Sequence, residues 1–192
     1  DVKEAFLKLK EGGKMERLII DLRGNGGGLM SEAVEIVSLF VPKGTSVVSS
    51  RGKNGEMIKD YKTTSEPVNT EIPIMVLVNS SSASSSEIVA GALQDLDRAV
   101  IAGVRTFGKG LVQNILPVGY DNSLKLTIAK YYTPSGRCVQ AIDYSHRNKD
   151  GSVGYVPDSL KQEFKTKNGR SVYDGGGIAP DIEVETEYLS RP

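Results

Sequence analysis

The order buried strand, glycine- or serine-rich turn and amphipathic helix occurs twice in this sequence, and it constrains the fold more than any other feature. The apolar run 17–22 ends in a glycine cluster and is followed by apolar residues at helical spacing over 29–40. The apolar run 72–78 leads through a serine-rich turn into a second helical pattern, 88–96. Since such units return the chain to the same sheet, the repeated order predicts an α/β fold.

Further elements are predicted on both sides of these two units. A helical pattern opens the chain at 2–9, and 99–104 is a third strand. Alternating stretches at 111–116 and 124–132 predict two strands that pair through a turn near 121–122. The complete reading is a mixed sheet of α/β (α+β) type.

Two polar segments are expected to be less regular. Residues 47–70, with glycines in the middle, indicate a short hairpin or lip. Residues 143–177 are rich in loops, with a short helix expected at 160–164 before a last apolar stretch, 178–184. We expect the whole chain, 1–192, to form a single catalytic core.

Composition excludes several classes of protein. The 192 residues contain one cysteine, Cys138, and one histidine, His146, which excludes intrachain disulfides, cysteine-rich zinc sites and histidine-rich metal clusters. Lys and Arg total 24, as do Asp and Glu, so no net field favours nucleic acid or an anionic membrane. The apolar runs are too short for a membrane helix. Because the chain begins at Asp1 without a signal peptide, we expect a fragment or mature product.

Three clusters carry the candidate chemistry, each following a predicted strand: 21–28, 79–87 and 106–113. In open α/β sheets the carboxyl ends of the strands are where ligands bind. The glycine turn lacks the third glycine of a dinucleotide loop, since Leu29 stands there, and no Lys-Ser/Thr pair follows. It suits either a tight strand-to-helix turn or backbone amides directed at an oxyanion.

Serine and lysine residues in these clusters leave two interpretations open. Ser84 and Glu87 fit a helix capping box, but a hydroxyl at a helix N-terminus is also well placed as a nucleophile. His146, the one histidine, lies in a polar stretch typical of a solvated loop. Lys109, between Gly108 and Gly110, is either a turn residue or the base of a Ser/Lys pair.

Five stretches of the sequence, in this order, closely resemble the C-terminal processing peptidases, also called tail-specific proteases. The stretches are 18–28, 78–95, 105–113, 131–137 and 175–181. The resemblance implies a Clp protease/crotonase-like core with helices flanking a twisted sheet, and a Ser/Lys endopeptidase without metal or cofactor.

Carried over by residue, the resemblance implies that Ser84 is the nucleophile, Lys109 the general base and Gln113 the amide that holds the lysine in place. The oxyanion donors would be the backbone N–H groups of Gly28 and Ser85. Family members commonly have alanine where this chain has Ser85, which leaves a backbone donor unchanged.

The resemblance also implies partners and a compartment. The substrates would be proteins with an exposed nonpolar C-terminus, and the compartment periplasmic or otherwise exported in a bacterium. The family's PDZ domain usually precedes the core, and we expect it to be absent from this piece of chain. Homo-oligomerisation is left open.

Two other functions remain as alternatives. One is a non-catalytic ligand- or peptide-binding module on the same fold, as in retinoid-binding relatives. The other is an acyl-CoA enzyme of crotonase type, which has no need for a Ser/Lys pair.

Overall fold

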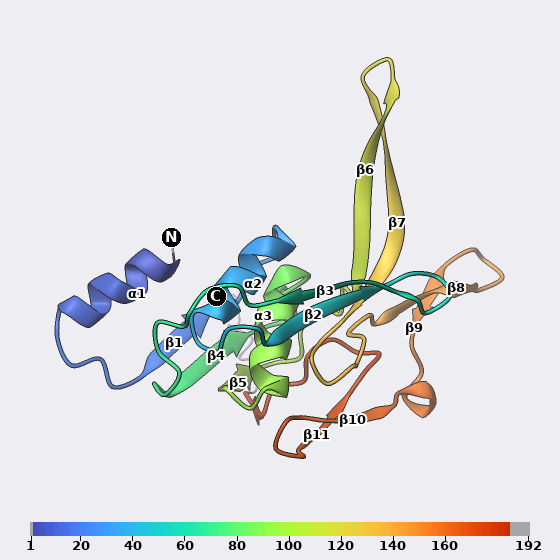
Figure 1. Cartoon of the computed structure of the whole chain (residues 1–192). Helices are drawn as coiled ribbons and strands as arrows, with labels where there is room; N and C mark the ends of the chain where they lie inside the picture. The colour runs from blue at the N-terminus through green and yellow to red at the C-terminus, as the bar shows by residue number, and fades with distance from the viewer. Residues whose placement is uncertain (1, 185–192) are drawn as a thin grey trace, which may run out of the picture.

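A computed structural model of the chain describes residues 2–184 (Figure 1). Its helices are α1 (Val2–Glu11), α2 (Met30–Ser38) and α3 (Ser85–Asp95), with one 3-10 turn, η1 (Asp158–Leu160). The first seven strands are β1 (Leu18–Asp21), β2 (Ser46–Arg51), β3 (Met57–Lys62), β4 (Ile74–Val78), β5 (Ala99–Gly103), β6 (Leu111–Gly119) and β7 (Asn122–Tyr132). The remaining strands are β8 (Ile142–Arg147), β9 (Val153–Tyr155), β10 (Glu163–Lys165), β11 (Ser171–Tyr173) and β12 (Ile182–Glu183).

The first sheet is parallel and has the order β1-β4-β5-β12. Asp21 at the end of β1 is level with Leu77 of β4, and Val78 is level with Gly103 of β5. The carboxyl ends of β1, β4 and β5 therefore meet at one edge. The turns that follow them are the three clusters of candidate chemistry.

The helices α2 and α3 pack against each other, and both contact β2 of the second sheet, while α3 also contacts β5 of the first (Figure 1). The core joins buried side chains from both sheets and both helices, among them Val37, Val48, Val76 and Leu93. This arrangement confirms the predicted α/β fold with helices flanking a sheet. Among residues 2–184, none of the helices is long and apolar enough to cross a membrane.

Burial along β1 and β4 differs from the prediction. Both were expected to be buried strands, yet half-buried and exposed residues alternate in β1, where Ile19 is 62% exposed, and buried and half-buried residues alternate in β4. The physical reason is that α2 and α3 cover one face of the sheet, so alternate side chains point to a face that the described residues leave open.

A second sheet, antiparallel, has the order β3-β2-β7-β6. The strands β2 and β3 form a hairpin that begins at Ser46, one residue before the 47–70 segment for which a hairpin was expected. The strands β6 and β7 pair through the turn predicted near Asp121 and Asn122, and they extend as a long arm away from the body (Figure 1). The register shifts by one residue between Val112 and Gln113, which marks a β-bulge at the base of the arm.

Residues 142–173 form two short hairpins, β8 with β9 and β10 with β11. The short helix predicted at 160–164 is wrong: η1 ends at Leu160, and Phe164 lies in β10, opposite Val172. The half-buried Phe164 side chain and its strand partner outweigh the local helical pattern. From the stretch 178–184, only Ile182–Glu183 is strand.

Candidate active site

Hydrogen bonds tie the three turns at the sheet edge to one another. The Asn79 side chain accepts the N–H of Gly24 at 3.0 Å, which joins the serine turn to the glycine turn. Ser82, fully buried, donates its hydroxyl to the Leu22 carbonyl at 2.7 Å, and its own carbonyl accepts the N–H of Phe107 at 3.0 Å. Ser82 therefore links all three clusters, so this member of the serine run has a structural role.

Ser84 has an unusual backbone conformation. It precedes α3 with φ 57° and ψ −119°, in a region that residues with a side chain rarely adopt. Strain of this kind persists only where surrounding contacts impose it, and it is common at functional sites. A strained serine between a strand and a helix is the geometry that exposes a nucleophilic hydroxyl at the top of a sheet.

Glu87 holds the backbones of Ser84 and Lys109 together. Its Oε2 accepts the N–H of Ser84 at 2.9 Å and the N–H of Lys109 at 2.8 Å. Its Oε1 accepts the N–H of Gly108 at 2.7 Å and the hydroxyl of Thr106 at 2.6 Å. The Glu87 carboxylate thus binds three residues that lie 19 to 22 positions after it in the chain. The Glu87 half of the capping pair expected from the sequence is formed, and Glu87 also binds the turn that carries Lys109.

Burial raises the pKa of Glu87 above its ordinary value of 4.5, because the charged form is desolvated; the four hydrogen bonds act in the opposite direction. The residue is 0% exposed. A buried carboxylate with four donors and no cationic partner among them is expensive to maintain, which suggests that the geometry it imposes matters.

Tyr131 provides a second link between the same two residues. Its hydroxyl lies 3.1 Å from the Ser84 carbonyl and 2.5 Å from the Lys109 carbonyl. The side chain is 1% exposed, and burial raises its pKa well above the ordinary value, so it remains a neutral phenol. Sequence analysis missed Tyr131, although its place in an alternating strand could have indicated an inward-facing polar group.

The turn that carries Lys109 packs closely against residues 140–141 of the same chain. Gly108 has φ +87°, and a Cβ there would lie 2.3 Å from the Ala141 Cβ; one at Gly110 would lie 2.7 Å from the Gln140 nitrogen. Both glycines are thus required by close approach. Lys109 is half-buried between them. Hydrogen bonds to Glu87 and Tyr131 link the backbones of Ser84 and Lys109. Within residues 2–184, no hydrogen bond joins the side chains of these two residues.

The glycine turn packs directly on the nucleophile candidate. Gly27 has φ +91°, and a Cβ there would lie 2.8 Å from the Ser84 Cβ and 2.6 Å from the Ala83 carbonyl oxygen. The next residue, Gly28, donates its N–H to the Ser85 hydroxyl at 2.6 Å. The two expected oxyanion residues, Gly28 and Ser85, are therefore neighbours in space.

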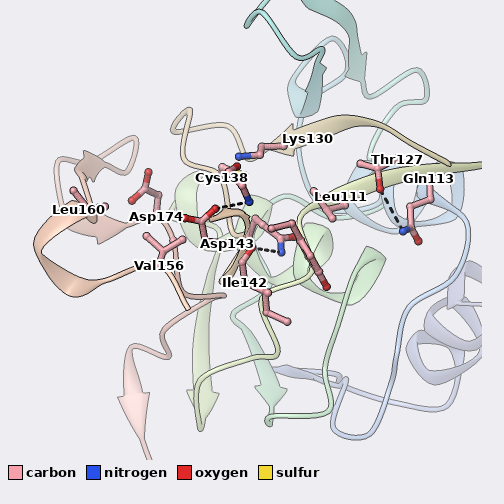
Figure 2. A pocket seen from close by; sticks show the side chains of 14 residues that line it. Leu111, Gln113, Thr127, Lys130, Cys138, Ile142, Asp143, Val156, Leu160 and Asp174 are labelled. Carbon is pink, nitrogen blue, oxygen red and sulfur yellow. Dashed lines mark hydrogen bonds between the residues drawn. The ribbon is translucent and has the colours of Figure 1, made fainter. Parts of the chain in front are cut away.

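Gln113 lies apart from these contacts. Its exposed side chain projects from β6, where its amide nitrogen is 3.5 Å from the Thr127 hydroxyl, and no hydrogen bond to Lys109 is formed within the described residues (Figure 2). It lines a cavity of about 490 Å³ together with apolar side chains such as Leu111 and Val156. Figure 2 shows that Lys130, Asp143 and Asp174 also face this space.

His146 is remote from a catalytic environment. It lies in β8, its side chain is 87% exposed, and its Nδ1 is 2.6 Å from the Asp143 carboxylate. Within residues 2–184, His, Cys, Asp and Glu side chains form no group of three suited to a metal ion.

Comparison with known proteins gives one family. Residues 1–147 match Peptidase family S41. The carboxy-terminal-processing protease of Bartonella bacilliformis is 46% identical over 129 residues, covering 67% of this chain and 30% of that protein. A probable CtpA-like serine protease of Staphylococcus epidermidis is 36% identical over 200 residues, covering 100% of this chain and 40% of that protein.

Among solved structures, the photosystem II D1 C-terminal processing protease superposes with a TM-score of 0.71 at 29% identity, covering 96% of this chain and 38% of that one. A putative S41 protease from Bacteroides fragilis, at 17% identity and a TM-score of 0.62, shares the fold. The chain spans 30 to 40% of the length of these two curated relatives. Because the family match covers well over half of its residues, the chain belongs to peptidase family S41, the family of the carboxyl-terminal processing proteases.

Proposed function

We propose that this protein is a serine endopeptidase that cleaves proteins near their C-termini through an acyl-enzyme on Ser84, with Lys109 as general base. The observation that carries the proposal is the double link between these two residues. Their N–H groups share Glu87 Oε2, and their carbonyl groups share the Tyr131 hydroxyl. Such an arrangement holds the backbones of the two residues near each other, which supports the assignment of a nucleophile and its base to these positions.

In the proposed mechanism, the uncharged Lys109 amine accepts the Ser84 proton while Oγ attacks the peptide carbonyl. The N–H groups of Gly28 and Ser85 hold the oxyanion. Ser85 is the first residue of α3, where backbone N–H groups have no intrahelical acceptor and the helix dipole favours negative charge. Lys109 then protonates the leaving amine, and water releases the acyl group.

The substrate is proposed to bind as an added strand. β6 is an edge strand of the second sheet and begins two residues after Lys109, so a peptide paired along it would run toward Ser84. The cavity beside Gln113 offers apolar walls from Leu111 and Ile142 for a nonpolar side chain. A protein substrate with an exposed nonpolar C-terminus fits both features.

We also propose that Gln113 orients the Lys109 amine once substrate is bound, and that the protein works in an exported compartment, as the sequence resemblance implies. The non-catalytic alternative is not favoured, because a binding module has no use for a strained Ser84 linked twice to a lysine backbone.

The direct test is cleavage of an unfolded protein that ends in nonpolar residues, combined with intact-mass detection of a fluorophosphonate adduct. The wild type should cleave and carry the adduct on Ser84, and Ser84→Ala should do neither. Ser81→Ala, at an exposed serine of the same turn, is the matched control and should behave like the wild type. Cleavage by Ser84→Ala at the wild-type rate would remove Ser84 from the mechanism.

A further inference from the structure

The Ser85 side chain occupies one of the two amides that the proposed oxyanion hole needs. Its hydroxyl oxygen accepts the Gly28 N–H at 2.6 Å, a short hydrogen bond between residues 57 positions apart. The mechanism requires that same N–H for the oxyanion. An amide carries a single hydrogen, so it cannot serve the hydroxyl and the oxyanion fully at once.

The surroundings of this hydrogen bond allow it to open. Ser85 is only partly buried, and Gly28 is exposed, with no atom within 4 Å of where its Cβ would be. Rotation of the serine side chain to another staggered position therefore moves the hydroxyl away without shifting backbone. Gly27, in contrast, is fixed against Ser84, so the Gly28 amide itself stays in place.

We propose that the Ser85 hydroxyl is an internal competitor for the oxyanion hole, occupying the Gly28 N–H in the free protein and leaving it when the tetrahedral intermediate forms. This rests on the proposed function. The oxyanion wins the exchange, because a hydrogen bond to a charged acceptor is about twice as strong as one to a neutral hydroxyl. The competition lowers the rate, since it stabilises the free enzyme but not the transition state.

The proposal assigns a sign to one substitution. Ser85→Ala keeps both backbone donors and removes the competitor, so the free protein has only water on the Gly28 N–H. We expect kcat/KM for a peptide ending in nonpolar residues to rise about 5-fold, equivalent to about 1 kcal/mol. Alanine is well tolerated in the first turn of a helix, and thermal unfolding should show no loss of stability.

A second measurement separates competition from a merely structural role. A peptide aldehyde, which forms a tetrahedral adduct with a serine nucleophile, should bind Ser85→Ala about 5-fold more tightly than wild type. The affinity for the amine-side cleavage product, whose new end is an amino group and not a carboxylate, should be unchanged. Ser81→Ala, at an exposed serine of the same turn that is not part of the proposed hole, should stay near wild type in both assays.

Outcomes for this proposal and for the proposed function are distinguishable. If the wild type cleaves and is labelled on Ser84, but Ser85→Ala is equally fast or slower, the competitor role is overturned while the peptidase assignment stands. A slower variant would mean that the hydroxyl assists the hole instead. If the wild type neither cleaves nor is labelled on Ser84, the proposed function fails and this inference fails with it.

Discussion

Replacing Glu87 by glutamine tests whether the buried carboxylate builds the site. The amide has the same shape, but one of its two positions becomes an NH2 donor. At the Oε2 position, that donor would face the N–H groups of both Ser84 and Lys109. At the Oε1 position it would face the Gly108 N–H, and the Thr106 hydroxyl would have to turn away. Either orientation leaves at least one buried donor without an acceptor.

An unsatisfied buried donor costs about 1–3 kcal/mol, so we expect Glu87→Gln to lower the free energy of unfolding in urea by that amount. Cleavage should fall about 10- to 100-fold, because displaced Ser84 and Lys109 lose the alignment that the reaction needs. Glu35→Gln, on the exposed face of α2, is the matched control and should change the unfolding free energy by no more than about 0.5 kcal/mol.

The pH dependence of this variant has a defined sign. Because burial raises the pKa of Glu87 in the folded state, the protonated group favours folding, and this contribution is lost as pH rises through the raised value. Wild type should therefore gain stability relative to Glu87→Gln as pH falls from neutral toward 4.5, the ordinary value. Equal stability of the two proteins across this range, with unchanged cleavage, would refute the reasoning.

Two further substitutions test the glycine turn and Gln113. Gly27→Ala should reduce cleavage by at least about 100-fold, since its Cβ would lie 2.8 Å from that of Ser84. Gly28→Ala has open space around the new Cβ and should stay near wild type. Similar cleavage rates for the two variants in kinetic assays would contradict this expectation. Gln113→Ala should lower kcat about 10-fold with KM unchanged if the amide orients Lys109. A higher KM with unchanged kcat would mean that Gln113 only lines the cavity. Asn114→Ala is the control.

The order of elements and the gathering of the three clusters were predictable from the sequence. Strand periodicity and turn residues are local signals, and carboxyl ends of parallel strands necessarily share an edge. The turns carrying Gly28, Ser84 and Lys109 follow strands of this sheet, and their hydrogen bonds confirm that they lie together.

The contacts that align the site were not predictable in the same way. Tyr131 is one residue in an alternating strand, and only the fold brings its hydroxyl to the carbonyls of Ser84 and Lys109. Glu87 could be identified as a capping residue, but its bond to the Lys109 N–H depends on a turn 22 residues away. The error at 160–164 has the same origin, because pairing of Phe164 opposite Val172 is a non-local contact.

The central claim is that a lysine, not the histidine, activates Ser84, and a paired kinetic measurement tests it most directly. Lys109→Ala should lower kcat by at least about 100-fold, the smallest effect expected from loss of a general base, while retaining the wild-type melting temperature. His146→Ala, at an 87% exposed side chain, should cleave at the wild-type rate. An active Lys109→Ala protein beside an inactive His146→Ala protein would contradict the account.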